Sequence, residues 1–272
     1  MDYVLYHSNC LDGFGSALSA WKKLKHKANY IPVSHGHGIP DIGTDAKTIY
    51  IVDFCFSPSE LDVLANLCDK VVILDHHKTA LENLTNYSNP KVEVTFDMTK
   101  SGALLTWEHF HKEEAPELIK WISDRDLWKF EYKESELAHK ALCSYPMDFS
   151  IWDNFLKNPK TLISEGEVCT RLYNQLVDNI VKSSWITQLA GHTIPVVNTT
   201  IAWSEVGQAL LKKYPDAEFA ASFTVYGEET MWSLRSKTHF DVSAIARLFD
   251  GGGHKNAAGF KIKKPNRNVE II

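Results

Sequence analysis

Side chains that can bind metal ions stand at the ends of three apolar, strand-like runs in the first third of the chain. The runs cover residues 3–7, 48–54 and 70–77. The polar residues at their ends, or just beyond the first end, are His7, Asp12, Asp53, Asp75, His76 and His77. Because the carboxyl ends of parallel strands lie at one edge of a sheet, we expect these side chains to converge in one crevice.

Carboxylates gathered in this way need a counter-charge. Several buried carboxylates repel one another and lose their hydration, and divalent cations remove that cost. Oxygen and imidazole ligands without paired thiolates favour manganese, magnesium or ferrous iron over structural zinc. A single aspartate at a strand end is more often a turn former or a helix cap. The coincidence of a His-His pair with Asp12 and Asp53 nevertheless favours a metal site.

A second group of residues, suited to binding an anion, lies near the end of the sequence. It comprises Gly251, Gly252, Gly253 and His254. One glycine after a helix is an ordinary cap, but three in a row also let backbone amides approach an anion closely. The imidazole of His254 can donate to a phosphate oxygen. Arg235, at the end of a strand-like segment, can bind a phosphate through two hydrogen bonds. Together with the first group, this pattern indicates phosphoester chemistry.

The elements that must position these residues alternate between strands and helices over the first 130 residues. The sequence predicts a fourth strand at 92–97 and helices at 14–25, 58–69, 102–113 and 116–124. The run Ser57-Pro58-Ser59-Glu60 is typical of a capping box, and it precedes the helix that ends near residue 69. Near-continuous Val and Ile runs between helices predict a parallel sheet covered on both faces.

The rest of the chain changes character twice. Residues 130–185 are mostly helical in pattern, with breaks at Pro146 and Pro159. Strand-like runs at 194–198 and 219–226 then flank a helical pattern at 203–213, and another helix is expected at 242–249. The predicted fold class is α/β, with a parallel-sheet N-terminal domain, a helical connecting region and a smaller mixed α/β C-terminal domain. The expected boundaries are 1–130, 131–188 and 189–272.

The composition narrows the classes of protein that fit. The chain has 272 residues, a formal net charge of −5 and a hydrophobic fraction of 44%, which excludes a disordered chain. Its longest apolar runs fall far short of the roughly 18 residues that a membrane span requires, so we expect no membrane partner. The acidic balance argues against broad electrostatic binding of long nucleic acid. A short anionic substrate held by metal ions remains compatible with it.

Cysteine usage points to a reducing compartment. The five cysteines are an odd number and include no Cys-x-x-Cys pair. This pattern argues against a disulfide framework and against a zinc ribbon. We therefore expect a cytoplasmic protein.

Two motifs resemble those of a known family. The run Leu74-Asp75-His76-His77-Lys78 resembles the namesake motif of the DHH phosphoesterase superfamily. Residues 251–260 resemble the Gly-Gly-Gly-His-x-x-Ala-Ala-Gly-Phe motif of its DHH-associated C-terminal domain. Further marks follow in family order, namely His7…Asp12-Gly13, Val52-Asp53-Phe54 and Asp124-Arg125-Asp126-Leu127-Trp128. The resemblance covers residues 3 to about 262, and the length favours the branch of nanoRNase-like and cyclic-nucleotide enzymes over the larger RecJ-type exonucleases.

The resemblance implies a pair of metal ions, manganese with magnesium or iron as possible substitutes. The implied metal ligands are His7, Asp12, Asp53, His76 and Asp124. Asp53 would bridge the two ions, and His77 would act in catalysis by facing the phosphate. The residues implied to hold the substrate are Arg235, Gly251, Gly252, Gly253 and His254.

The function expected from this resemblance is that of a metal-dependent phosphodiesterase or exonuclease-type hydrolase. It would cleave phosphodiester bonds of short oligonucleotides or of linear or cyclic dinucleotides by means of a water activated by two metal ions. One alternative is an inorganic pyrophosphatase or polyphosphatase. A second is a non-catalytic homologue that binds nucleic acid. Short nucleic acids or nucleotides are the expected partners.

Two positions carry open alternatives. Cys10 occupies a place where family members commonly have an aspartate, so it is either a thiolate ligand or a small buried residue, and we expect the latter. Trp128 and Tyr145 are candidates for stacking a base. For Trp128 we expect packing in the core, the usual place for a tryptophan.

Overall fold

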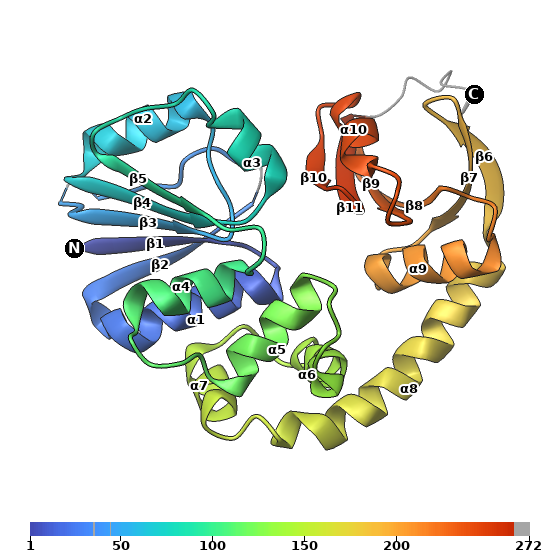
Figure 1. Cartoon of the computed structure of the whole chain (residues 1–272), viewed down its shortest axis with the longest axis horizontal. Helices are drawn as coiled ribbons and strands as arrows, with labels where there is room; N and C mark the ends of the chain where they lie inside the picture. Colours follow the sequence, from blue (N-terminus) through green and yellow to red (C-terminus); the bar gives the residue numbers. More distant parts are fainter. Residues whose placement is uncertain (35, 44, 264–272) are drawn as a thin grey trace. The chain divides into compact units, whose positions relative to one another are not determined.

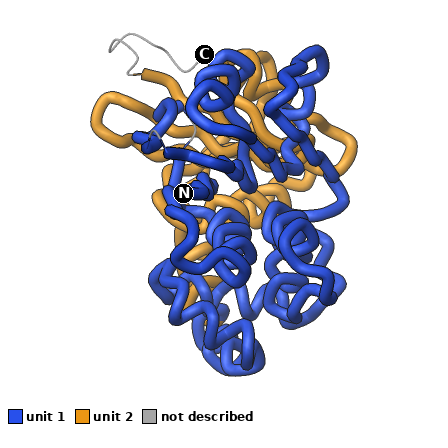
Figure 2. The backbone as a smooth tube through the Cα atoms, turned by 90° about the vertical axis from the view of Figure 1, so that its left-hand side faces the viewer, with its two compact units in different colours: residues 1–170 blue, residues 171–272 orange. Residues whose placement is uncertain are grey.

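The computed structural model describes residues 1–34, 36–43 and 45–263. The chain divides into two compact units, residues 1–170 and 171–272 (Figure 2). Each unit has its own sheet and its own hydrophobic core. The expected three-part division at residues 130 and 188 stays a prediction.

The sheet of the first unit is built from parallel strands. Among the described residues it contains five strands in the order β2-β1-β3-β4-β5. The strands are β1 (Asp2–His7), β2 (Ala28–Val33), β3 (Thr48–Val52), β4 (Lys70–Asp75) and β5 (Val92–Phe96). The predicted parallel α/β class is confirmed.

The register of the central strands brings their ends level. Tyr6 of β1 pairs with Val52 of β3, and Val52 pairs in turn with Leu74 of β4. The next residue of the chain after each of these is His7, Asp53 or Asp75. The parallel pairing therefore places these three residues side by side at one edge of the sheet.

Helices cover both faces of this sheet, as predicted. They are α1 (Leu11–Leu24), α2 (Pro58–Leu67), α3 (Lys78–Asn83), α4 (Gly102–Phe110) and α5 (Glu117–Asp126), with a 3₁₀ turn at Lys25–Lys27. Figure 1 shows α1 and α4 on one face and α2 on the other. On the first face, Ala20 and Leu105 pack against Val52, while on the second Leu61 and Leu64 belong to a separate apolar cluster.

The helical segment that follows belongs in large part to the first unit. It contains α6 (Lys133–Leu142), α7 (Phe149–Lys157) and α8 (Thr161–Lys182), and α8 continues into the second unit. Trp121 of α5 and Trp152 of α7 lie in the same buried cluster as Phe14 of α1. This cluster fixes α5 against α1, and the end of α5 carries acidic residues of the site described below.

The second unit is a mixed α/β fold. Its described residues form a six-stranded sheet in the order β10-β11-β9-β8-β7-β6, in which β7 and β8 are parallel and the other neighbours antiparallel. The strands are β6 (Trp185–Leu189), β7 (His192–Asn198), β8 (Phe219–Tyr226), β9 (Glu229–Ser236), β10 (Gly252–His254) and β11 (Ala257–Lys263), and the helices are α9 (Trp203–Lys213) and α10 (Val242–Arg247). The predicted smaller mixed domain is confirmed as a fold class.

Of the local sequence patterns, the capping box was predicted correctly and one strand was missed. The capping box exists, since the amide of Glu60 donates to Oγ of Ser57 and the amide of Ser57 donates to Oε2 of Glu60. Strand β2 was not predicted, because it is an edge strand that contains Pro32 and has mostly half-buried or exposed residues.

In the described part of the chain, no helix combines the length and the apolar character needed to cross a membrane.

Candidate metal centre

Asp53 lies at the centre of the site, directly after β3. Its backbone has a φ of 64°, a left-handed conformation that is uncommon for a residue with a side chain. The amide of Asp53 donates to the carbonyl of Leu74 across the sheet, at 3.0 Å. The carboxylate is buried, with Oδ1 3.2 Å from Nε2 of His76 and Oδ2 3.5 Å from Nδ1 of His7.

Asp12 reaches the same place from the first turn of α1. Its Oδ2 accepts a hydrogen bond from the amide of Gly102 at 2.7 Å, and its Oδ1 accepts one from the amide of Ala103 at 3.0 Å. Amides in the first turn of a helix have no partner within the helix, so this carboxylate satisfies two of them in α4. Asp12 thereby ties α1 to α4 beside the edge of the sheet.

Two glycines allow the close approach of these elements. A Cβ atom on Gly13 would lie 2.1 Å from the carbonyl oxygen of His7. A Cβ atom on Gly102 would lie 2.5 Å from Cβ of Asp53 and 2.9 Å from its Oδ1. Neither position has room for a larger side chain while the site keeps this geometry.

His76 stands among three carboxylates. Its Nε2 atom lies 3.2 Å from Asp53 Oδ1, 3.7 Å from Asp12 Oδ2 and 3.6 Å from Asp126 Oδ2. The imidazole is buried, whereas the side chain of Asp126 keeps 28% of its surface exposed. The sequence interpretation did not assign a role to Asp126.

Asp124, which was expected to be a metal ligand, has a different environment. Its Oδ1 accepts a hydrogen bond from the amide of Glu131 at 2.8 Å, and its Oδ2 accepts one from the amide of Tyr132 at 3.4 Å. Asp126, two residues further along α5, is the acidic residue of this segment that lies beside His76. The spacing Asp124-x-Asp126 was the available signal, but it does not say which carboxylate faces the site.

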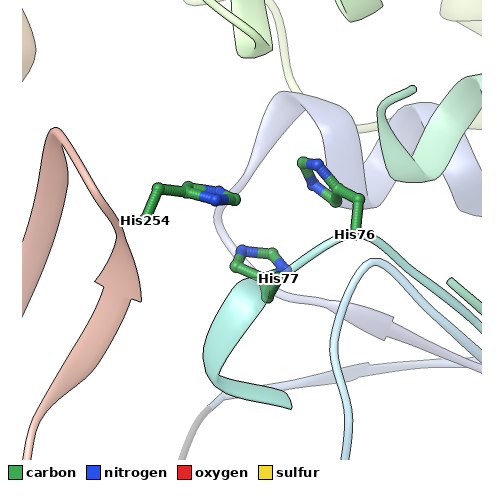
Figure 3. A group of neighbouring side chains, drawn as sticks. All are labelled: His76, His77 and His254. Atoms are coloured by element: carbon green, nitrogen blue, oxygen red, sulfur yellow. The ribbon is translucent and has the colours of Figure 1, made fainter. Parts of the chain in front are cut away.

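His77 is held by the aspartate that ends β4. Oδ1 of Asp75 lies 2.7 Å from Nδ1 of His77 and also accepts the amide of His76 at 2.8 Å. Asp75 is fully buried. Figure 3 draws His76 and His77 at the end of β4 and the start of α3, together with His254 of β10. The contact with Asp75 puts the proton of the His77 ring on Nδ1 and orients the ring.

The electrostatics of the site are those of crowded carboxylates around an imidazole. Burial, together with the charges of Asp53 and Asp126, raises the pKa of Asp12 well above its usual range. Burial would also raise the pKa of Asp53, but the neighbouring imidazoles of His7 and His76 hold it well below its usual range. Burial would lower the pKa of His76, but its carboxylate neighbours raise it to about 10. In the metal-free protein, the proton of His76 thus supplies the counter-charge.

The donor set fits divalent cations. Among the described residues of the first unit, three groups each have ligand atoms within 4.8 Å of one another. They are His7/Cys10/Asp53, Asp12/His76/Asp126 and Asp53/Asp75/His76/His77. Asp53 belongs to two of these groups, and its two carboxylate oxygens could each serve a different ion. Among the described residues, no hydrogen-bond partner reaches the buried Oδ2 atom of Asp53, so this atom has a lone pair available for a ligand.

Cys10 lies inside this arrangement. It is half-buried just before α1, and its Sγ is within ligand distance of side-chain atoms of His7 and Asp53. Burial and the charges of Asp53, Asp126 and Asp12 raise the pKa of the Cys10 thiol well above its usual range. Both roles considered for this residue therefore remain, but its position matches that of a ligand.

In the second unit, the residues expected to hold phosphate occupy neighbouring strands. His254 of β10 pairs with Ala257 of β11, and Ala257 pairs with Arg235 of β9. Directly paired residues point to the same face of a sheet, so the imidazole and the guanidinium flank a small side chain. Arg235 Nη2 donates to Oγ of Ser204 at 2.7 Å, and Nη1 donates to the carbonyl of Leu234 at 2.8 Å.

The glycines next to this row have a packing role. A Cβ atom on Gly251 would lie 2.2 Å from the carbonyl oxygen of Gly259, and one on Gly253 would lie 2.6 Å from that of Ala257. Gly253 also has a φ of 134°, which side chains rarely allow. The close pairing of β10 and β11 explains these two glycines, and their binding of phosphate stays a prediction.

Comparisons with known proteins identify a family domain and two relatives of this chain. Residues 191–272 match the DHHA1 domain. The chain is 30% identical over 284 residues to the uncharacterized protein R106 of Acanthamoeba polyphaga mimivirus, covering 95% of this chain and 67% of that protein. It is 24% identical to the oligoribonuclease NrnB of Bacillus subtilis, covering 96% of this chain and 73% of that protein.

A solved structure shares the fold. RecJ of Thermus thermophilus, in complex with Mn²⁺, matches 96% of this chain and 49% of its own with a TM-score of 0.50 and 14% sequence identity. At this level of identity, the match supports the architecture alone.

Proposed function

This chain belongs to the DHH phosphoesterase superfamily, and on that premise we propose that it is a metal-dependent phosphodiesterase acting on short oligonucleotides or on linear or cyclic dinucleotides. The observation that carries the proposal is the sharing of Asp53 between two neighbouring groups of ligand atoms at one sheet edge, since its Oδ1 lies beside His76 and its Oδ2 beside His7. Such sharing suits a pair of ions close together, the arrangement used in two-metal phosphoester hydrolysis.

The proposed ligands divide into two sets around Asp53. One ion would be held by Asp12, His76 and Asp126 with Asp53, and the other by His7 and Asp53 with Cys10 as a further donor. Bound divalent ions, manganese in this proposal, supply charge neutralisation of phosphoryl oxygens and a water of lowered pKa. Asp126 takes the place first assigned to Asp124 because its carboxylate is the one beside His76.

The chain's own residues then position the substrate. Asp75 fixes the His77 ring through Nδ1, so Nε2 points away from Asp75 and can donate to a phosphoryl oxygen when the ring is protonated. Burial would lower the pKa of His77, but the charge of Asp75 and its hydrogen bond raise it. Asp12, fixed by two amides of α4, keeps its carboxylate in one orientation without a change of conformation.

The second unit is proposed to bind a phosphate of the substrate. Arg235 and His254 would both donate to phosphate oxygens from one face of the sheet. Ser204 accepts a hydrogen bond from Arg235 and so limits the conformations of its guanidinium group. The residues proposed to contribute with them are Gly251, Gly252 and Gly253.

The two other functions remain alternatives with less support. A pyrophosphatase or polyphosphatase would use the same metal ligands, but the relative named as an oligoribonuclease aligns over 96% of this chain. A non-catalytic homologue would be expected to lose ligands, whereas His7, Asp12, Asp53 and His76 are all in place. A cytoplasmic location is part of the proposal, since none of the five cysteines, all of which lie in the described ranges, forms a disulfide.

Removal and return of the metal tests the proposal. The protein is treated with a chelator, dialysed, and assayed on a dinucleotide with and without added Mn²⁺. We expect activity to disappear on chelation and to return with Mn²⁺. In the same assay, Asp53→Asn should remain inactive with Mn²⁺, whereas Asp216→Asn, at an exposed position of the second unit, should behave as the unaltered protein. Activity that survives chelation would contradict the metal mechanism.

A further inference from the structure

The loop between α5 and α6 (Figure 1) carries three exposed aromatic side chains, Trp128, Phe130 and Tyr132. Trp128 and Phe130 each keep 39% of their surface exposed, whereas Trp121 and Trp152 of the same unit are buried. The expectation that Trp128 packs in the core is therefore wrong. We call the pair Trp128 and Phe130 the aromatic shelf.

The shelf is an ordered arrangement of rings. The Trp128 and Phe130 rings meet edge to face, with centroids 4.9 Å apart and planes inclined by 79°. The guanidinium carbon of Arg125 lies 4.1 Å from the centroid of the Trp128 ring and 5.6 Å from that of Phe130. Arg125 itself is buried. A buried cation thus supports the tryptophan ring from the protein side, and the exposed surface of the ring is available to a ligand.

The backbone that presents the shelf is strained and held in place. Trp128 and Phe130 have φ values of 57° and 55°, a conformation that aromatic residues rarely adopt. Asp124 stabilises it, because its carboxylate accepts the amides of Glu131 and Tyr132. Its carbonyl accepts the amide of the intervening lysine at 3.0 Å. Strain of this kind persists where the surroundings impose it and is concentrated at functional sites.

The shelf starts next to the acidic group, the name used here for Asp12, Asp53 and Asp126 with the His76 imidazole between them. Asp126 is two residues before Trp128, and its carboxylate lies 3.6 Å from Nε2 of His76. Its side chain is 28% exposed, in contrast to the buried side chains of Asp12 and Asp53, so the acidic group opens to solvent at Asp126. The shelf thus begins two residues along the chain from a carboxylate beside His76, at the solvent-exposed side of the place proposed for the phosphate.

We propose that Trp128 and Phe130 form a stacking site for a nucleobase of the substrate, with Asp124 as the residue that positions their loop. The proposal rests on the proposed function and names its substrate class, which is molecules with a base attached to the scissile phosphate. Aromatic rings bind bases through their faces with little preference for sequence, and a supporting guanidinium group strengthens the contact. Pyrophosphate and polyphosphate have no group that would use such a shelf.

Binding of adenosine 5′-monophosphate and of ribose 5-phosphate to the Mn²⁺-loaded protein tests the proposal. Ribose 5-phosphate lacks the base and carries a hydroxyl group in its place. We expect the unaltered protein to bind the nucleotide more tightly than the sugar phosphate. Trp128→Ala should weaken nucleotide binding by about 5- to 100-fold, the usual effect of losing one stacked base. It should leave the binding of the sugar phosphate unchanged, and Trp128→Phe should retain most of the difference.

Trp185→Ala provides a matched control. Trp185 lies on β6, keeps 42% of its surface exposed and has a phenylalanine edge-on at 6.0 Å, so it matches Trp128 in exposure and in having an aromatic neighbour. This variant should bind both probes normally. If the unaltered protein does not distinguish the two probes, or if Trp128→Ala weakens both equally, the proposal is wrong. A change of oligomeric state in Trp128→Ala with unchanged nucleotide binding would also overturn it, in favour of a surface for a second copy.

Separate measurements of binding and of hydrolysis distinguish the stacking site from the proposed phosphodiesterase function. Base-dependent binding that requires Trp128, in a protein that cleaves no phosphodiester, would support the stacking site and contradict the proposed function. Cleavage of dinucleotides with no effect of Trp128→Ala on base discrimination would do the reverse. Asp124→Asn should reduce base discrimination in the same way as Trp128→Ala while Mn²⁺ binding stays intact, a split that general unfolding would not produce.

Discussion

The Nε2 atom of His76 lies 3.2 Å from Oδ1 of Asp53, although the two residues are 23 positions apart in the chain. The register of the parallel sheet creates this contact, because Val52 of β3 pairs with Leu74 of β4 and the residues that follow emerge at the same edge. Asp12 and Asp126 approach the same imidazole from two helices. The acidic group is thus assembled from four separate segments.

Asp126 and Asp124 should differ in their effect on metal binding. Asp126→Asn removes a charged ligand beside His76, so the affinity for Mn²⁺ measured by calorimetry should fall by more than about tenfold. Loss of a residue that only supports a metal ligand already lowers metal affinity by about tenfold or more. Asp124→Asn is the matched control, since its carboxylate accepts backbone amides of the following loop. Equal losses in the two variants would mean that the assignment of Asp126 is wrong.

Cys10 should be visible in the spectrum of a cobalt-substituted protein. A thiolate bound to Co²⁺ gives a sulfur-to-metal charge-transfer band in the near ultraviolet, and oxygen and nitrogen ligands do not. We expect this band in the unaltered protein and its loss in Cys10→Ser, because Cys10 is within ligand distance of His7 and Asp53. Cys143→Ser, at an exposed cysteine, should keep the band. A spectrum without the band would make Cys10 a small half-buried residue and no ligand.

Gly102→Ala should disturb the centre without replacing a ligand. Its added methyl group would lie 2.5 Å from Cβ of Asp53, and overpacking of this kind typically costs about 1–3 kcal/mol. We expect a loss of unfolding free energy in that range by denaturant titration, together with weaker Mn²⁺ binding. Glu108→Ala, at an exposed position of the same helix, should leave Mn²⁺ binding unchanged. Normal metal affinity in Gly102→Ala would show that the close approach to Asp53 is unimportant.

The stability of the metal-free protein should fall as the pH rises. Burial would lower the pKa of His76, but Asp53, Asp126 and Asp12 raise it to about 10. An unfolded histidine titrates near 6.5, so the stability from this proton is fully present below about pH 6.5 and is lost as the pH rises toward 10. Thermal unfolding between about pH 7 and 9.5 should show the decline, and His76→Asn should flatten it.

The affinity for Mn²⁺ should rise over the same pH range in which the stability of the metal-free protein falls. Metal binding requires the neutral imidazole, so the affinity for Mn²⁺ should rise with pH as His76 loses its proton. The exposed His26 provides the control, and His26→Asn should keep both trends. A metal affinity that does not depend on pH, with an unchanged stability profile in His76→Asn, would contradict the placement of His76 among the carboxylates.

The sequence predicted the framework of the site better than its details. Apolar runs identify β1, β3 and β4, and polar residues at their ends have to meet once the strands are parallel. Strand β2 lies at an edge and contains Pro32, so it lacks the apolar run that marks a central strand. Local pattern is informative where burial is complete and weak where it is partial.

The choice between Asp124 and Asp126 shows why the remaining details were out of reach. Both lie in the last turn of α5, where two residues of separation turn the side chains to different sides. Which of them faces His76 depends on the packing of α5 against α1 and on the hydrogen bonds of Asp124 with the loop that follows. The exposure of Trp128 depends on the left-handed backbone of the same loop. Neither Trp128 nor Phe130 is a residue type that is typical of this conformation. These are tertiary effects, and no sequence window of a few residues contains them.

Product analysis by mass spectrometry tests the central claim most directly. The protein is incubated with Mn²⁺ and, in separate reactions, with oligonucleotides of two to ten residues, cyclic dinucleotides and pyrophosphate, and Asp53→Asn is run in parallel. The account predicts that short oligonucleotides or dinucleotides are converted to mononucleotides, that pyrophosphate is left intact, and that Asp53→Asn gives no product. Tight binding of a short oligonucleotide without any cleavage, or hydrolysis of pyrophosphate alone, would contradict it.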